Sequence, residues 1–212
     1  MNKKTLGICI PYYKNSEECE IEFKELMEQL EKQLTNDMIL YVYEDGQISD
    51  WLQEYKRENI IINSCKKNKG VSVARNTAID YLIDKVDYIL FIDSDDWVEN
   101  NYLPKVHEYC ADRTHEIVET TFYINGKLMQ YNPIEIRSCA SSSAIKTSII
   151  GNHRFDETIQ IGEDTKFMNE VVNLKEQRKR YCRADYYYQL GINPNSLIKR
   201  YERKEIDVER KR

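Results

Sequence analysis

The sequence is poor in the residues that zinc sites, disulfide scaffolds and flexible linkers require. It has 7 glycines, 4 prolines and 3 histidines among 212 residues, and its 6 cysteines form no C-x-x-C pair. The cysteines are Cys9, Cys19, Cys65, Cys110, Cys139 and Cys182. Scattered cysteines without histidines at ligand spacing exclude the common zinc motifs and fit a reducing compartment.

Long apolar runs and a surplus of basic residues are also missing. No run is long enough to cross a membrane, and the first strand after Met1–Thr5 is too short for the core of a signal peptide. The net charge of -5 argues against a general electrostatic grip on nucleic acid. We therefore expect a cytoplasmic protein with no general nucleic-acid binding.

Short apolar runs and amphipathic segments alternate in the first half of the chain. Strands are predicted at 6–10, 38–43, 60–62 and 88–92, and helices at 16–34, 50–57 and 70–82. This alternation predicts an α/β fold with a mixed, mainly parallel sheet and flanking helices.

The second half has a different pattern. We expect helices at 103–111 and 163–174, a hairpin of strands 117–124 and 127–131 around Asn125-Gly126, and a tyrosine-rich strand at 185–190. Residues 199–212 form a charged run, which predicts a solvated helix or tail after a main domain over residues 1–198. The basic residues of this run could contact an anionic membrane surface.

Acidic or aromatic residues follow three of the predicted strands. They are Pro11-Tyr12-Tyr13, Glu44-Asp45 and Asp93-Ser94-Asp95-Asp96. Ligands of open α/β sheets bind beyond the carboxyl ends of the strands. The three carboxylates at residues 93–96 repel one another, so a divalent cation is their natural partner, and oxygen ligands select Mg²⁺ or Mn²⁺.

Five short motifs in this order resemble family 2 glycosyltransferases of the GT-A fold, and the resemblance covers about residues 5–198. The motifs are I-C-I-P-Y-Y at 8–13, E-D-G at 44–46, G-V-S-V-A-R-N at 70–76, F-I-D-S-D-D at 91–96, and R-F-D-E at 154–157 with G-E-D at 162–164. The resemblance implies a Rossmann-like nucleotide-diphospho-sugar transferase fold.

The resemblance also implies a UDP-sugar donor, a bound Mn²⁺ or Mg²⁺, and roles for particular residues. Pro11 and Tyr13 would flank the nucleobase, Asp45 of the Glu44-Asp45 pair would accept the uracil N–H, Arg75 would lie near the base or phosphates, Asp93 or Asp95 would hold the ribose, and Asp95 or Asp96 would bind the metal.

The catalytic carboxylate implied by the resemblance is Asp164, next to Glu163. An ionised aspartate at this position could accept the proton of an acceptor hydroxyl as that oxygen attacks the anomeric carbon. One base and one leaving group imply inversion of configuration. The metal would stabilise the departing diphosphate.

The segment Tyr186-Tyr187-Tyr188-Gln189, followed by Asn195-Ser196, resembles the part of the family that covers the phosphates. Gln189 stands where an arginine is common, so phosphate binding would depend more on the metal, on Arg75 or on Lys199 and Arg200.

Three other functions are weighed against a glycosyltransferase. A nucleotide-sugar binding protein without turnover would lose the base or the metal ligands, and both are intact here. A sugar-nucleotide pyrophosphorylase would carry a glycine-rich phosphate loop after the first strand, where Pro11-Tyr12-Tyr13-Lys14 stands instead. A structural subunit that docks a partner through its tyrosines is the third. The transferred sugar and the hydroxyl-bearing acceptor stay open.

Overall fold

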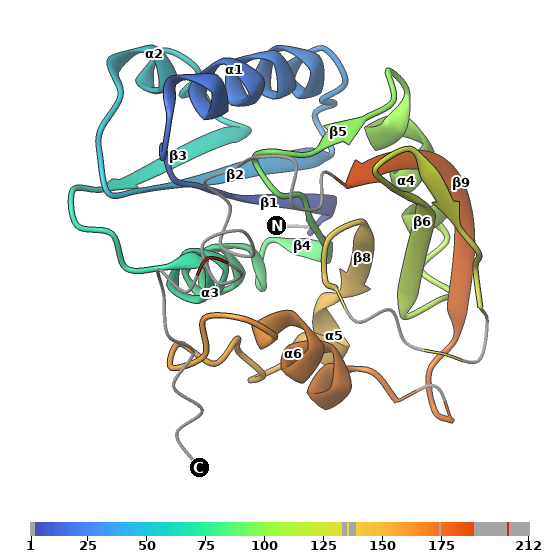
Figure 1. Ribbon diagram of the computed structural model, residues 1–212. Helices are drawn as coiled ribbons and strands as arrows, with labels where there is room; N and C mark the ends of the chain where they lie inside the picture. Colours follow the sequence, from blue (N-terminus) through green and yellow to red (C-terminus); the bar gives the residue numbers. More distant parts are fainter. Residues whose placement is uncertain (1–2, 133–134, 136–138, 174, 189–202, 204–212) are drawn as a thin grey trace.

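The computed structural model describes residues 3–132, 135, 139–173, 175–188 and 203. The strands form a 9-stranded sheet in the order β3-β2-β1-β4-β8-β6-β9-β5, with β7 paired to β6 (Figure 1). This confirms the predicted α/β class with a mixed, mainly parallel sheet. The predicted boundary at residue 198 and nearly all of the charged tail lie outside the described residues.

The first half of the chain is the parallel part of the sheet. It contains β1 (Lys4–Tyr12), α1 (Glu17–Glu31), β2 (Met38–Asp45), α2 (Asp50–Gln53), β3 (Ile60–Cys65), α3 (Val71–Leu82) and β4 (Val86–Phe91). β1 pairs in parallel with both β2 and β4, and β2 pairs in parallel with β3. Every predicted strand and helix of this half is present, although α2 is shorter than predicted.

The second half adds the antiparallel pairs and the far edge of the sheet. It contains β5 (Trp97–Val98), α4 (Tyr102–Ala111), β6 (Ile117–Ile124), β7 (Lys127–Met129), β8 (Ser143–Lys146), α5 (Thr147–Ile150), α6 (Glu163–Val171) and β9 (Lys179–Tyr188). The hairpin turn is confirmed, since Asn125 and Gly126 both have positive φ, as a tight two-residue turn requires.

β9 begins earlier than the sequence predicts, and β5, β8 and α5 were not predicted. The first residues of β9 are charged, so the sequence there lacks the apolar pattern that predicts a strand. In the fold, Lys179 Nζ lies 3.2 Å from Glu119 Oε1 on β6, and Arg180 Nη1 lies 2.6 Å from Asp112 Oδ2 after α4. Neighbouring elements therefore neutralise charges that by themselves would oppose placing this segment in the sheet.

Two apolar clusters cover the two faces of the sheet. One contains Phe23 and Leu30 of α1 and Val106 of α4, and the other contains Ile79 of α3 and Phe167 of α6. Helices α1 and α2 lie on one side of the sheet in Figure 1, and α3, α5 and α6 lie on the other. The sheet is thus the middle of three layers, which leaves the ends of its strands to form a site.

Helix α1 begins after Ser16, at the start of the predicted helix 16–34. The Ser16 hydroxyl accepts the Cys19 N–H at 3.2 Å, and acidic residues fill the first turn. In the described part of the chain, no helix combines the length and apolar character needed to cross a bilayer.

Candidate active site

The acidic ends of β2 and β4 lie on either side of the end of β1. Tyr12 of β1 pairs with Glu44 of β2, and Cys9 of β1 pairs with Phe91, the last residue of β4. Because all three strands run in the same direction, the residues that follow them gather at one edge of the sheet. The structure thus brings together the strand ends that the sequence singled out.

The two carboxylates at the end of β2 bind groups of the neighbouring loops. The carboxylate of Asp45 is 3% exposed and accepts the backbone N–H groups of Lys69 and Gly70 at 2.8 to 3.0 Å. The fully buried Glu44 accepts the Ser49 N–H at 2.8 Å and the Ser64 hydroxyl at 2.6 Å. Both carboxylates therefore fix the loops around them, and their contribution to donor binding stays a prediction.

An aromatic ring covers the turn after β2. A Cβ atom placed on Gly46, whose φ is +85°, would lie 2.9 Å from Cε2 of Tyr13. The turn therefore needs glycine both for its backbone conformation and for the close approach of the ring. Tyr13 is 44% exposed and Pro11 is half-buried, so both offer surface to a ligand at this strand end.

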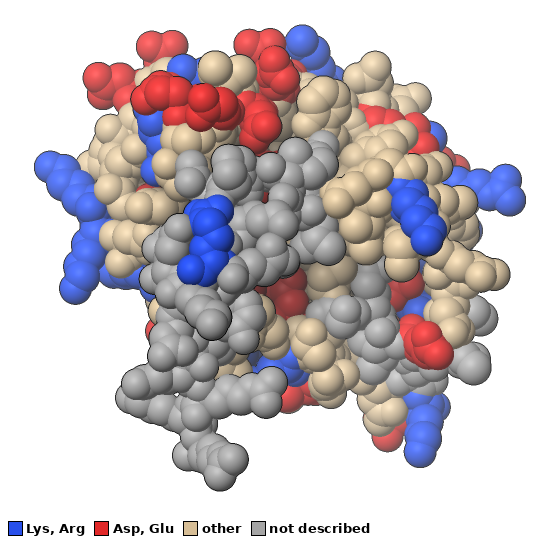
Figure 2. Space-filling model, in the orientation of Figure 1, with Lys and Arg blue, Asp and Glu red and all other residues tan. Residues whose placement is uncertain are grey.

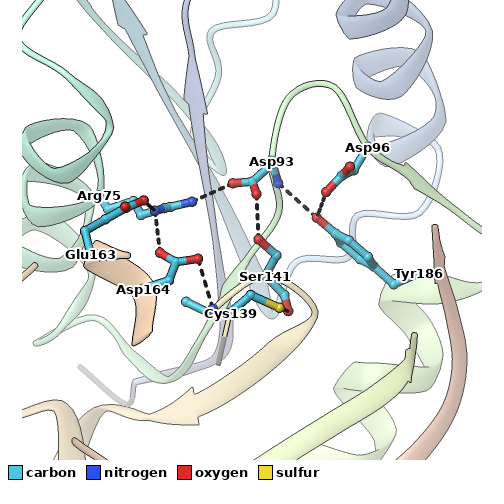
Figure 3. Close-up of polar contacts among 9 residues, drawn as sticks. Arg75, Asp93, Asp96, Cys139, Ser141, Glu163, Asp164 and Tyr186 are labelled. Carbon is cyan, nitrogen blue, oxygen red and sulfur yellow. Dashed lines mark hydrogen bonds and ion pairs between the residues drawn. The ribbon is translucent and has the colours of Figure 1, made fainter. Parts of the chain in front are cut away.

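A buried arginine connects the residues that follow β4 with the start of α6. Arg75 of α3 is 3% exposed. Its Nη1 donates to Asp164 Oδ1 at 2.6 Å and to Glu163 Oε1 at 3.0 Å, and its Nη2 donates to Asp93 Oδ1 at 2.8 Å (Figure 3). Arg75 thus joins three carboxylates that are far apart in the sequence.

The segment before β8 binds the outer oxygens of two of these carboxylates. The Ala140 N–H donates to Asp164 Oδ2 at 3.2 Å, and the Ser141 hydroxyl donates to Asp93 Oδ2 at 2.6 Å. A closed ring of contacts therefore runs through Arg75, Asp93, Ser141, Ala140 and Asp164 (Figure 3).

Sequence reasoning gave Ala140 and Ser141 no contact with the site acids. It named the small polar stretch at 138–144 only as a segment that could shape an acceptor groove. In the structure Ser141, Ser142 and Ser143 are fully buried, and Ser142 has a φ of 68°. Burial of three consecutive serines is what marks this segment as part of the site.

Burial raises the pKa of Asp164 to about 6. The positive charge of Arg75 opposes this shift, and the negative charges of Asp93 and Glu163 add to it. Burial likewise raises the pKa of Asp95 to about 6, with Asp93 as the next contribution. Both acids therefore lie where a carboxylate exchanges protons near neutral pH, which is typical of functional sites.

Asp95 and Asp96, which follow Asp93 after β4, differ in their surroundings. Asp96 is 2% exposed and accepts the hydroxyl of Tyr186 at 2.6 Å, while the same hydroxyl accepts the Asp93 N–H at 3.1 Å. Asp95 is half-buried and has no side-chain hydrogen-bond partner among the described residues. Asp95 is therefore the more available of the two to a cation.

A preformed metal cage is not seen in the part of the chain that the structure describes, where no three His, Cys, Asp or Glu side chains form a group able to hold an ion. The residues predicted to cover the phosphates lie partly outside the described residues. Tyr186–Tyr188 end β9, whereas Gln189, Asn195, Ser196, Lys199 and Arg200 are outside the described residues.

Comparison with known proteins identifies related sequences. The family model for Glycosyl transferase family 2 matches residues 7–176. The chain is 28% identical over 168 residues to the minor teichoic acid biosynthesis protein GgaB of Bacillus subtilis, covering 70% of this chain and 18% of GgaB. It is 23% identical over 128 residues to the poly(ribitol-phosphate) beta-N-acetylglucosaminyltransferase TarP of Staphylococcus aureus, covering 58% of this chain and 38% of TarP. The chain thus spans less than half the length of either relative.

The fold also resembles a solved structure. The crystal structure of S. aureus TarS 1-349 in complex with UDP-GlcNAc matches with a TM-score of 0.70 and 18% sequence identity, covering 87% of this chain and 58% of that chain. At this identity the likeness concerns the fold, and it agrees with the predicted GT-A architecture.

Proposed function

The chain belongs to glycosyl transferase family 2, and we propose that it transfers a sugar from a UDP-sugar to a hydroxyl group with inversion of configuration. The observation that carries this proposal is the ring of contacts around Arg75. It holds a base candidate, Asp164, and a donor-binding candidate, Asp93, against the same guanidinium at the carboxyl end of the sheet.

Asp164 has the properties of a general base. With a pKa near 6 it is mostly ionised at neutral pH, yet basic enough to take a proton from an attacking hydroxyl. Arg75 and the Ala140 N–H fix the orientation of its carboxylate. Glu163 shares Arg75 with Asp164 and thereby helps to position the arginine.

A divalent cation fits the acids after β4. Arg75 contacts three of the site carboxylates, Asp93, Glu163 and Asp164. Asp95 and Asp96 add two more negative charges in the same turn, and a UDP-sugar would add the charge of its diphosphate. Mg²⁺ and Mn²⁺ bind through one or two carboxylates together with substrate phosphates, so they need no preformed cage. When bound, such an ion stabilises the negative charge of the leaving diphosphate.

We assign Asp95 as the first metal ligand. Its raised pKa reflects burial and the negative charge of Asp93, which the charge of Arg75 offsets only in part, and a cation would remove that penalty. Asp96, bound by Tyr186, would orient the turn or add a second oxygen. Asp93 is then left to bind the ribose through the oxygens that Arg75 and Ser141 position.

The nucleobase would lie at the end of β2. The exposed ring of Tyr13 and the neighbouring Pro11 offer flat surfaces for stacking. Asp45 Oδ1 accepts one backbone N–H and keeps capacity for a second donor, such as the uracil N–H.

The relatives suggest which substrates to test first. The matched TarS structure contains UDP-GlcNAc, and TarP is named as an N-acetylglucosaminyltransferase. GgaB is named for teichoic acid biosynthesis. UDP-GlcNAc, UDP-glucose and UDP-galactose are therefore the donors to compare, and a hydroxyl of a wall polymer or other glycan is the acceptor that we propose.

Calorimetric titration of UDP with Mn²⁺ and with a chelator tests the donor site. Metal-dependent binding should weaken about tenfold or more in Asp95→Asn and persist in Asp164→Asn, since only the former loses a metal ligand. Asp156→Asn is the matched control, because that acid pairs with Lys166 at 2.6 Å away from the ring of contacts. Absence of UDP binding in the wild type under both conditions would refute the proposal.

Transfer itself is tested by incubation of a radiolabelled UDP-sugar with acceptor glycans. Asp164→Asn should reduce transfer by about 10²–10⁴-fold while binding UDP normally, as expected for loss of a general base. Equal transfer by Asp164→Asn and the wild type would remove Asp164 from the mechanism.

A further inference from the structure

Four large apolar side chains line up across four strands at the far edge of the sheet. Trp97 of β5 pairs with Tyr187 of β9, Tyr187 pairs with Tyr123 of β6, and Tyr123 pairs with Leu128 of β7. Partners directly opposite each other in a sheet point to the same face. We call Trp97, Tyr187, Tyr123 and Leu128 the aromatic row.

The aromatic row faces away from the core. The neighbouring residues Val98, Tyr186 and Phe122 are buried, whereas Trp97 is 53% and Leu128 is 54% exposed. Tyr123 and Tyr187 are half-buried, and their rings stack with centroids 4.9 Å apart. Exposed apolar side chains that are contiguous, rather than scattered singly, mark interaction surfaces.

The aromatic row begins next to the active site. Trp97 directly follows Asp96, and Tyr187 directly follows Tyr186, whose hydroxyl binds both Asp96 and the Asp93 N–H. Consecutive Cα atoms are about 3.8 Å apart, so the first two members start within one residue of the acidic turn after β4. In Figure 1, β5 and the end of β9 lie beside the loop that follows β4.

The chemistry of the aromatic row suits a sugar ring. A saccharide has apolar C–H faces that pack on aromatic rings, and its hydroxyls pair with polar groups at the edges of those rings. Tyr187 supplies both features, because its hydroxyl lies 3.3 Å from Asp185 Oδ2 at the edge of the sheet. None of the four members carries a charge, although Lys and Arg side chains stand out from the same end of the molecule in Figure 2.

We propose that the aromatic row is an acceptor subsite, which binds a neutral sugar ring next to the hydroxyl that receives the transferred sugar. This inference rests on the proposed function, since it assigns an acceptor to the same active site. A second copy of this chain is a poorer occupant. Four partly exposed side chains offer only a few hundred Å², whereas a stable dimer buries about 1,200–2,000 Å².

Tryptophan fluorescence gives a direct test, because the chain has 2 tryptophans. In a Trp51→Phe variant, Trp97 is the remaining reporter, and its exposed indole should shift its emission to shorter wavelength when a sugar stacks on it. Cellohexaose, chitohexaose and maltohexaose are titrated with UDP and Mn²⁺ present, with glycerol as the control solute. A saturable shift with at least one hexaose is expected, and no shift with any of them would overturn the proposal.

Calorimetry with substituted proteins tests the same subsite without a fluorescent reporter. Trp97→Ala and Tyr187→Ala should each raise the Kd for the responding hexaose by about tenfold and leave the Kd for UDP unchanged. Ile21→Ala on α1 is the matched control, since Ile21 is 57% exposed and lies outside the aromatic row. An unchanged hexaose Kd in Trp97→Ala, with normal UDP binding, would overturn the subsite and leave the proposed function intact.

Two other outcomes are distinguishable. A wild-type protein that binds hexaoses but never UDP would refute the proposed function rather than the sugar-binding surface. Sedimentation velocity over about a hundredfold range of concentration shows whether two copies associate. An emission shift that follows protein concentration instead of sugar concentration would assign the aromatic row to self-association and overturn the proposal.

Discussion

The two acidic strand ends that flank β1 are held in opposite ways. At the end of β2, Glu44 and Asp45 bind groups that lie 5 to 25 residues away in the sequence. At the end of β4 most contacts are longer in range, since Ser141 binds Asp93 at a separation of 48 residues and Tyr186 binds Asp96 at 90. Arg75 lies only 18 residues from Asp93, but it also binds Asp164 at a separation of 89. One end is a local structure, and the other exists only when the whole domain has folded.

The difference matches the tasks that we propose for the two ends. A nucleobase pocket can be shaped by a turn and the loop beside it, because stacking and one hydrogen bond suffice. A site that moves a sugar must hold the base, the donor and the metal at fixed distances from one another, which requires groups from several elements. The substitutions below test whether damage stays local at the first end and spreads at the second.

Arg75→Met should have the largest effect on stability. It removes the buried cation shared by three partly buried carboxylates, and breaking buried ion pairs typically costs about 3–5 kcal/mol of unfolding free energy. Urea unfolding near pH 7 measures the loss. The control is Arg154→Met, whose pair with Asp80 is more exposed and should cost less than about 1 kcal/mol. Equal losses in both variants would show that the ion pairs of Arg75 stabilise the fold no more than an exposed ion pair does.

The pH dependence of transfer should report Asp164. Its raised pKa means that the base is protonated below about pH 6, so kcat/KM at saturating metal should fall about tenfold per pH unit below that value and level off above it. Initial rates measured from about pH 5 to 8 define this acidic side of the pH profile of kcat/KM. A profile that is flat down to about pH 4.5 would indicate that a different group is the base.

The same pKa has a consequence for stability with the opposite sign. The folded protein holds the Asp164 proton more tightly than the unfolded chain does, so this group stabilises the fold below about pH 4, and the contribution is lost as the pH rises through about 6. Unfolding of Asp164→Asn should lack this component, and urea titrations at about pH 4 and pH 7 compare the two proteins.

Tyr186→Phe should have an intermediate effect at the same strand end. The variant removes the hydroxyl that binds Asp96 and the Asp93 N–H, at a cost of about 1–3 kcal/mol, and should weaken metal-dependent UDP binding. Tyr187→Phe is the control on the neighbouring residue, because its hydroxyl makes a longer contact of 3.3 Å. Thermal unfolding measures the stability of both variants, and calorimetry measures their affinity for UDP. Equal stability and equal UDP affinity in the two variants would contradict the expectation.

Asp45→Asn should have the smallest effect on stability and confine it to the end of β2. One side-chain oxygen can still accept the Lys69 and Gly70 N–H groups, so a loss of about 0.5–1.5 kcal/mol is expected. UDP affinity should decrease, whereas the pH limb of transfer should not move. A shifted pH limb would show that the two strand ends are coupled after all.

Much of this could be predicted from the sequence because it depends on local patterns. Alternating apolar runs predicted the parallel strands and the helices of the first half, and acidic residues directly after those runs predicted the carboxylates at one edge. The ion pairs of Arg75 were missed, since the motif placed it only near the base or phosphates. Nothing in the spacing indicates that one guanidinium would bind Asp93, Glu163 and Asp164 together.

By itself, the sequence determined the fold class, the order of strands and helices in the first half, and the acids that follow β2 and β4, because apolar periodicity and strand-end polarity are properties of neighbouring residues. Only the tertiary structure decided that Ser141 and Ala140 bind the candidate carboxylates Asp93 and Asp164, that Lys179 of β9 pairs with Glu119, and that an aromatic row starts beside the acidic turn after β4. Those features depend on burial and on pairing between distant segments, which exist only after the sheet has assembled.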